Sequence, residues 1–129
     1  MAETITKRVL VVDDSTMVRR YMRDALERGQ FEVQEAFNGV EAMEKVLSEP
    51  VDLLIVDVNM PKMDGYAFLH ALRGRDGTIA SIPALMTSTE AGPQDVAAAY
   101  AAGANYYLVK PVSQDDLLAY ADALTGRTP

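Results

Sequence analysis

Five side chains that suit phosphoryl chemistry each follow a short apolar run of this sequence. The runs span residues 9–12, 53–56, 82–86 and 106–109, and the polar residues that end them are Asp13 with Asp14, Asp57, Thr87 and Lys110. Runs without polar alternation are typical of strands buried on both faces, as in a parallel sheet. Because the crevice at the carboxyl ends of such strands collects functional groups from distant parts of a chain, we expect one phosphoryl-accepting site with Asp57 as its reactive residue.

Neutralising charge is the chemical problem that such a site must solve. A carboxylate is a poor nucleophile toward a phosphodonor unless the charge on the phosphoryl oxygens is neutralised, and a hard divalent cation held by carboxylates does this. We therefore expect Mg²⁺, or Mn²⁺ in its place, among three carboxylates whose mutual repulsion prepares them for a cation. Lys110 offers a compact charge to one phosphoryl oxygen and Thr87 a hydroxyl to another. Transfer to Asp57 would depend on positioning and electrostatic stabilisation.

Strand-like runs alternate with helix-like stretches along the chain, and these stretches have recognisable ends. The expected helix starts are Ser15, Asn38 with Glu41 in a capping-box position, Asp64, Gly92 before Pro93, and Ser113 with Asp116. The first helix is predicted over residues 15–28 with Gly29 as a left-handed stop, followed by a strand over residues 31–36. The second helix is predicted to end at Leu47.

Single helices between strands predict right-handed crossovers and a parallel sheet that is covered on both faces. The expected fold class is α/β, a doubly wound five-stranded parallel sheet with five helices. Strand order 2-1-3-4-5 is expected because it brings Asp13, Asp14 and Asp57 together at the point where the winding direction reverses. One domain is expected over residues 8–124, with residues 1–7 and 125–129 as short terminal tails.

Composition narrows the classes of function. The 129 residues contain no cysteine, which excludes disulfides and thiolate metal sites, and their formal net charge of −7 argues against nucleic acid as a main partner. No apolar segment has the length of a signal peptide or a membrane span, so we expect a soluble, cytoplasmic protein with no membrane partner. Arg19, Arg20 and Arg23 share a predicted helix and are interpreted as a solvated face.

Four segments resemble the receiver domains of bacterial two-component response regulators, and among these the stand-alone chemotaxis-type (CheY-like) receivers. The segments are VLVVDDS, LLIVDVNMPKMDG, ALMTSTE and YYLVKP, and the resemblance extends from about Arg8 to Leu124. It implies the flavodoxin-like receiver fold. It also implies a signalling protein that is not an enzyme and that catalyses only its own phosphorylation and dephosphorylation.

The resemblance implies a role for each residue of the metal site. Asp57 would be phosphorylated and Asp14 would bind the divalent ion directly. Asp13 would bind the ion through water, and the backbone carbonyl of Asn59 would bind it directly. Each position matches the family pattern in this chain.

The same resemblance implies a phosphoryl-binding set made of Asn59, Thr87, Ser88 and Lys110. Ser88 departs from the family pattern, in which Ala or Gly is usual because the backbone there approaches the phosphate, so a slightly tighter pocket is expected. Asn59 and Thr89 border the path of the attacking water in the family, which predicts that Asn59 affects dephosphorylation more than phosphorylation. Pro111 is expected to follow a cis peptide bond.

A switch is also implied by the family pattern. The Thr87 hydroxyl would move toward the phosphoryl group while Tyr107 turns inward, and Tyr106 should point to the opposite face of its strand. The change would remodel the surface around helix four, strand five and helix five, where a target protein would bind. Candidate target-facing residues are Ala91, Val96, Tyr100, Tyr107 and Asp115.

The function expected from these features is phosphorylation of Asp57 by a histidine kinase or a histidine phosphotransfer protein, followed by phosphorylation-dependent protein binding in chemotaxis or motility. The alternative is a phosphorelay intermediate or phosphate sink in a stress or developmental pathway. A phosphorylation-independent pseudo-receiver is a weaker reading. An aspartyl-nucleophile phosphatase is also weaker, because the position two residues after Asp57 holds Asn59, which cannot act as a general acid.

Several of these residues have simpler interpretations. Asp13 or Asp14 could only cap a helix, Thr87 could be a turn hydroxyl, and Lys110 could be a surface charge. The sole histidine, His70, lacks a second ligand at helical spacing and is not expected to bind metal or phosphate. Most methionines are interpreted as packing residues.

Overall fold

The computed structural model describes residues 6–127 of the chain. Its strands are β1 (Arg8–Val12), β2 (Glu32–Ala36), β3 (Leu53–Asp57), β4 (Ala84–Ser88) and β5 (Tyr106–Val109). Its helices are α1 (Thr16–Arg28), α2 (Gly39–Ser48), α3 (Gly65–Arg73), α4 (Pro93–Ala102) and α5 (Gln114–Thr125), with a short 3₁₀ helix, η1 (Thr78–Ser81). The strands are parallel and ordered β2-β1-β3-β4-β5, which confirms the predicted topology.

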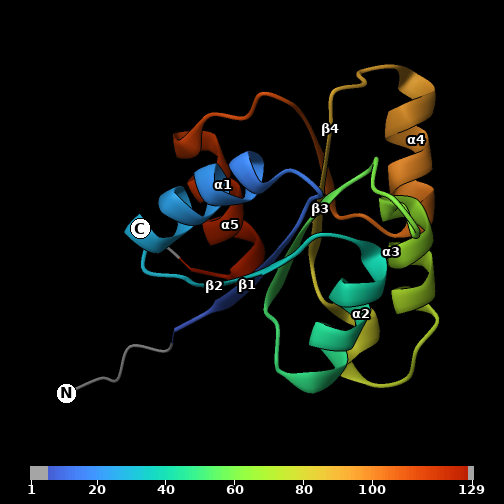
Figure 1. The fold of residues 1–129 in the computed structure, drawn as a ribbon, viewed down its shortest axis with the longest axis horizontal. Coiled ribbons are helices and arrows are strands. Elements are labelled where there is room, and N and C mark those ends of the chain that lie inside the picture. Colours follow the sequence, from blue (N-terminus) through green and yellow to red (C-terminus); the bar gives the residue numbers. More distant parts are fainter. Residues whose placement is uncertain (1–5, 128–129) are drawn as a thin grey trace.

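Two layers of helices enclose the sheet. Figure 1 shows α1 and α5 on one face and α2, α3 and α4 on the other. Alternate strand residues fill a core on each face: Val9, Val11, Leu53 and Ile55 toward α1 and α5, and Leu10, Val12, Leu54 and Val56 toward the other helices. Every residue of β3 and β4 is buried. A fully buried aliphatic side chain contributes roughly 1.5–3 kcal/mol, so the strand ends that carry Asp57 and Thr87 are firmly held.

Side-chain caps start four of the helices where the sequence predicts them. The side chains of Ser15, Asn38, Asp64 and Ser113 each accept a hydrogen bond from the backbone N–H three residues ahead, at 2.8–3.2 Å. Pro93 is the first residue of α4, as expected. Each cap contributes about 1 kcal/mol, so local chemistry fixes where the chain leaves each loop beside the sheet.

The end of α1 differs from the prediction. Gly29 has φ −82°, so it is not left-handed, and Gln30 adopts the positive φ of 67° instead. Gly29 matters for a different reason, because a Cβ at this position would overlap Leu118 Cδ2 of α5 and this side chain would have to shift. The glycine therefore permits close packing of α5 on α1 rather than a special backbone conformation.

The expected C-terminal tail is wrong for residues 125–127. Helix α5 extends to Thr125, and Gly126 follows it with φ 75°. The Arg127 guanidinium carbon lies 3.8 Å from the centroid of the Phe31 ring, and its Nε donates to Asp122 Oδ1 at 3.0 Å. These contacts tie the end of α5 to the α1–β2 connection. The outer parts of both expected tails, residues 1–5 and 128–129, lie outside the described residues.

Smaller differences concern element ends. β2 starts at Glu32 and α2 ends at Ser48, one residue later than predicted in each case. β4 begins at Ala84 because η1 and Pro83 occupy the preceding segment. No helix within residues 6–127 combines the length and apolarity needed to cross a membrane.

Candidate phosphoryl-accepting site

The carboxyl ends of the three central strands bring the expected site together. Asp57 is the last residue of β3 and lies directly beside Thr87 of β4 in the strand register. Asp13 follows β1 on the other side of β3, and its N–H donates to Ala36 O of β2 at 3.1 Å. Since the connections from β1 and β3 leave in opposite directions along the sheet, a crevice forms at this point.

Three carboxylates form one acidic cluster in this crevice. Oxygen atoms of Asp13, Asp14 and Asp57 lie within 4.8 Å of one another. Asp13 and Asp57 are buried and Asp14 is exposed. The capping interpretation of the pair fails because Ser15 caps α1, while Asp13 Oδ1 accepts from Ser15 N at 2.9 Å. Carboxylate oxygens in a partly buried, negatively charged cluster fit a hard divalent cation.

Lys110 completes the buried charge arrangement. Its Nζ donates to Asp13 Oδ2 at 2.8 Å and to Asp57 Oδ1 at 2.9 Å. Burial alone lowers the pKa of Lys110, but the hydrogen bonds to Asp13 and Asp57 outweigh burial and raise it. The side chain is therefore a charged member of the site and not a surface charge.

Asp57 is the carboxylate with the most perturbed environment. Burial raises the pKa of its carboxyl above the ordinary value of 3.8, and the hydrogen bond from Lys110 offsets this only in part. The negative charges of Asp13 and Asp14 raise the pKa further. The ionised form of Asp57 is thus held in an unfavourable setting that a cation would relieve.

The two hydroxyl groups at the end of β4, those of Thr87 and Ser88, differ in their hydrogen bonding. Thr87 Oγ1 is buried and has no hydrogen-bond partner among the described residues. Ser88 Oγ accepts from Glu90 N at 3.1 Å and so supports the following loop. A buried polar group without a partner costs about 1–3 kcal/mol, so the Thr87 hydroxyl is available to a group that the described residues do not supply.

The loop after β3 is shaped by one glycine that the sequence reasoning did not single out. Gly65 N donates to Val58 O at 2.9 Å, and a Cβ at Gly65 would overlap the backbone oxygen of Asp57. The missed signal is the glycine directly after the Asp64 cap. The loop therefore returns close to the end of its own strand, and Asn59 within it is exposed.

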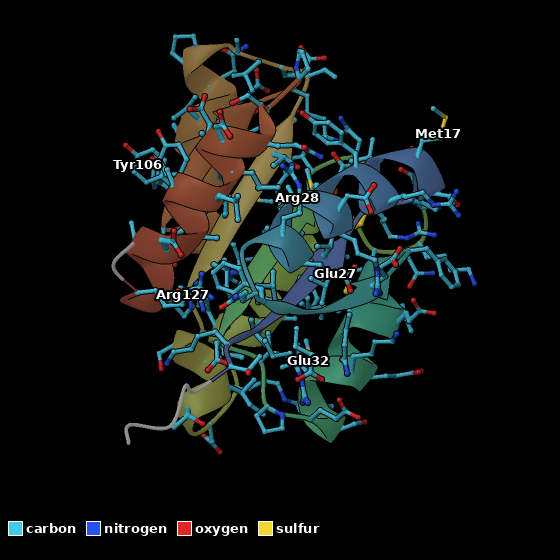
Figure 2. The ribbon with its side chains drawn as sticks, turned by 90° about the vertical axis from the view of Figure 1, so that its left-hand side faces the viewer. Met17, Glu27, Arg28, Glu32, Tyr106 and Arg127 are labelled. Carbon is cyan, nitrogen blue, oxygen red and sulfur yellow. The ribbon has the colours of Figure 1, made fainter. Side chains whose placement is uncertain are left out.

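The two tyrosines of β5 point to opposite faces, as expected. Tyr107 is 8% exposed, and its hydroxyl donates to Glu90 O at 2.7 Å. Tyr106 lies toward α5, where its ring centroid is 4.6 Å from that of Tyr120 (Figure 2). The structure therefore contains the inward position of Tyr107, linked directly to the loop after β4. Switching of Tyr107 stays a prediction.

The remaining candidates lie around the site or away from it. The Lys110–Pro111 peptide bond is cis. An apolar pocket of about 450 Å³ opens beside Lys110, with Thr89 and Tyr21 among its lining residues. Figure 2 shows Met17, which also lines this pocket and is 82% exposed, projecting from the first turn of α1. His70 is exposed on α3 and is not part of the crevice.

The interpretation of the α1 arginines as a solvated face is wrong for two of them. Arg19 Nη1 donates to Asp13 O at 2.6 Å, and Arg19 Nε and Arg23 Nε donate to the two oxygens of Glu35 at 2.9 and 2.7 Å. Arg20 alone of the three is exposed. The structural reason is that β2 places Glu35 beside α1, a contact between distant segments that helical spacing does not reveal.

Comparisons with known proteins agree with this fold. The sequence model of the response regulator receiver domain matches residues 9–122. Chemotaxis protein CheY1 of Helicobacter pylori (strain ATCC 700392 / 26695) is 39% identical over 121 residues, covering 92% of this chain and 97% of CheY1. Response regulator MprA of Mycobacterium tuberculosis (strain ATCC 25618 / H37Rv) is 38% identical over 121 residues, covering 94% of this chain. The chain spans about half of the length of MprA, 51%.

A solved structure gives the same result for the fold. The chemotaxis response regulator CheY4 of Vibrio cholerae superposes with a TM-score of 0.86 and 35% sequence identity, covering 93% of this chain and 99% of CheY4. The parallel sheet, its acidic crevice and these relatives together lead to one conclusion: the chain belongs to the response regulator receiver domain family.

Proposed function

We propose that Asp57 accepts a phosphoryl group from a histidine kinase or a histidine phosphotransfer protein, and that the phosphorylated chain then binds a target protein. The observation that carries this proposal is the buried, unpartnered hydroxyl of Thr87 beside Asp57 in the strand register. A hydroxyl without a hydrogen-bond partner among the described residues is available to bind a ligand that reaches this carboxylate. Lys110 at 2.9 Å from Asp57 Oδ1 supplies the positive charge for that ligand.

A divalent ion, Mg²⁺ or Mn²⁺, would be held by oxygens of Asp13, Asp14 and Asp57 and by the backbone carbonyl of Asn59. The cluster fits such an ion because its three carboxylate oxygens lie within 4.8 Å of one another. When bound, the ion neutralises charge on the phosphoryl oxygens. The roles of Asp14 as a direct ligand and Asp13 as a ligand through water remain part of the proposal.

The transfer step forms a bond from an Asp57 carboxylate oxygen to phosphorus and breaks the phosphorus–nitrogen bond of the donor's phosphohistidine. The electron pair of the broken bond stays on the imidazole nitrogen, which takes up a proton, and Asp57 becomes an acyl phosphate. Lys110 would move from the free carboxylate to a phosphoryl oxygen, and the Thr87 hydroxyl would donate to another. Asn59 and Ser88 would complete the phosphoryl-binding set. Positioning and charge account for most of the catalysis expected of such a site.

The output surface would be formed by α4, β5 and α5. Thr87 and Tyr107 would act as the switch, because Tyr107 is hydrogen-bonded to the loop that follows Thr87. Tyr100 is exposed near this surface and Val96 is partly buried beside it; Ala91 and Asp115 are further exposed candidates. Chemotaxis is the pathway favoured by the similarity to CheY1 and CheY4.

The test of phosphorylation is intact mass measurement after incubation with acetyl phosphate, with and without Mg²⁺. The wild-type chain is expected to gain one phosphoryl mass only when Mg²⁺ is present, and the Asp57→Asn chain is expected to gain none. A wild-type chain that gains no mass with Mg²⁺ present would overturn the proposal. A chain that is phosphorylated but shows no phosphate-dependent binding of a target protein would instead favour the relay or phosphate-sink alternative.

A further inference from the structure

We propose that Arg19 is a positioning residue for the metal site: its guanidinium holds the backbone carbonyl of Asp13 and thereby fixes the place of the Asp14 carboxylate. This inference rests on the proposed function, since it concerns affinity for the divalent ion. Arg19 touches neither the proposed ion nor the reacting carboxylate of Asp57, so it acts through the chain that carries the ligands.

Arg19 is held by three separate acceptors. Its Nη1 donates to Asp13 O at 2.6 Å, its Nε to Glu35 Oε1 at 2.9 Å, and its Nη2 to Thr16 Oγ1 at 3.2 Å. The side chain is only 13% exposed. The donors of a planar guanidinium have fixed directions, so they hold several acceptors at fixed positions relative to one another. A flexible ammonium group does not do this.

The held carbonyl belongs to the peptide unit that joins Asp13 to Asp14. This unit is planar, so fixing its oxygen also fixes the orientation of Asp14 N and Cα. Asp13 has further anchors, because its N–H donates to Ala36 O at 3.1 Å and its Oδ1 accepts from Ser15 N at 2.9 Å. The side chain of Asp14 is exposed, so the orientation of its backbone sets the range of positions that its carboxylate can reach.

Glu35 anchors the guanidinium to the edge strand β2. Its second oxygen accepts from Arg23 Nε at 2.7 Å, and its backbone oxygen accepts from Lys45 Nζ at 2.6 Å. Burial raises the pKa of Glu35, but the hydrogen bonds from Arg19 and Arg23 outweigh burial and lower it. Glu35 therefore stays ionised and keeps Arg19 in place.

Two possible roles of Arg19, through its charge or through positioning Asp14, predict opposite effects of its replacement on the affinity for a cation. If only the charge of Arg19 acted on the site, its removal would leave the acidic cluster more negative and tighten binding of a cation. If Arg19 positions Asp14, its removal weakens binding even though a positive charge has been lost. Arg23 is a matched control, because it shares Glu35 with Arg19 but has no hydrogen bond to Asp13.

The experiment is isothermal titration calorimetry of Mg²⁺ into the full chain at one fixed ionic strength. Arg19→Gln is expected to bind Mg²⁺ about tenfold more weakly than wild type, the usual order of loss when a group that orients metal ligands is removed. Arg19→Lys, which keeps the charge and one hydrogen bond, is expected to lose less, and Arg23→Gln is expected to stay within about twofold of wild type. Arg19→Lys also serves as the folded variant if Arg19→Gln does not fold.

Two results would overturn the inference alone while the wild-type chain binds Mg²⁺: Arg19 variants that bind as tightly as wild type or more tightly, or an Arg23→Gln chain that loses as much affinity as Arg19→Gln. No Mg²⁺ binding by the wild-type chain would overturn both the proposed metal site and this inference. Phosphorylation gives a second readout. The Mg²⁺ concentration for half-maximal rate should rise in Arg19→Gln, while the rate at saturating Mg²⁺ should recover toward wild type.

Discussion

Lys110 Nζ lies 2.9 Å from Asp57 Oδ1, so an ammonium group already contacts the carboxylate that is proposed to react. The same nitrogen lies 2.8 Å from Asp13 Oδ2. The lysine therefore neutralises part of the acidic cluster in the absence of phosphate, and we expect it to turn to the phosphoryl oxygens afterwards. One side chain would serve both the resting and the phosphorylated site.

Replacing Lys110 tests this double role. We expect Lys110→Met to slow phosphorylation by acetyl phosphate at least about 100-fold, because the site loses the charged donor for a phosphoryl oxygen. The rate would be followed by intact mass at saturating Mg²⁺. Arg20→Gln removes the same amount of charge from an exposed position of α1 and is expected to keep the wild-type rate. Equal slowing in both variants would mean that net charge, and not Lys110, controls the reaction.

The raised pKa of Asp57 predicts how stability depends on pH. A carboxyl that binds its proton more tightly in the folded state contributes its full stability below the unfolded pKa, near 3.8, and loses it as the pH rises through the higher folded pKa. Asp57→Asn removes this loss. We therefore expect the variant to melt a few degrees above wild type at pH 7 without Mg²⁺, and this difference to shrink as the pH falls toward 3.8.

Thermal unfolding followed by circular dichroism across this pH range is the measurement for Asp57→Asn. Asp76→Asn, which makes the same change in net charge at an exposed position, is expected to melt like wild type. Mg²⁺ should stabilise the wild-type chain more than Asp57→Asn, because the variant lacks one carboxylate ligand. A lower melting temperature for Asp57→Asn at pH 7 without Mg²⁺ would show that the carboxylate stabilises the fold, contrary to this account.

Replacing Thr87 is expected to have opposite effects on the stability of the fold and on signalling. Thr87→Val keeps the branched shape in a buried strand but removes an oxygen that has no hydrogen-bond partner in the described chain. We expect the free energy of unfolding to rise by about 1 kcal/mol, while phosphorylation-dependent target binding is lost. Urea unfolding and a binding assay check the two effects, with Thr87→Ser as the variant that retains the hydroxyl. A destabilised Thr87→Val would mean that the hydroxyl is satisfied within the protein.

Tyr107 tests the proposed switch through a single hydrogen bond. Tyr107→Phe keeps the buried ring but loses the 2.7 Å bond to Glu90 O, so we expect unchanged phosphorylation of Asp57 and altered affinity for the target. Faster amide exchange in the loop after β4 should accompany the change, since this loop loses an anchor. Tyr106→Phe is the control for loss of a hydroxyl on the other face of β5. Target binding that is unaffected by both Tyr107→Phe and Tyr107→Ala would remove Tyr107 from the switch.

The sequence predicted which of these residues lie together because their places follow from local pattern. A polar residue that ends an apolar run must lie at a strand end, and parallel strands bring those ends together, which placed Asp57 beside Thr87. Helix starts were equally local, since a cap bonds to a residue three positions ahead. Contacts between distant segments were not predictable in this way. The prediction for Arg19 was wrong because its partner Glu35 comes from β2. The predicted start of the C-terminal tail was wrong because Arg127 packs on Phe31.

Replacing Asn59 tests whether the loop after β3 controls the lifetime of the phosphoryl group. Its side chain is exposed in the loop after β3, and we expect it to affect a water that approaches the acyl phosphate without altering the carboxylate cluster. Asn59→Ala leaves the backbone carbonyl in place, so we expect Mg²⁺ affinity to stay within about twofold of wild type, the limit set for Arg23→Gln above. Dephosphorylation, followed by loss of the phosphoryl mass after the donor is removed, should change more than the rate of phosphorylation. Equal changes in both rates would place Asn59 in phosphoryl binding itself rather than on the path of the water.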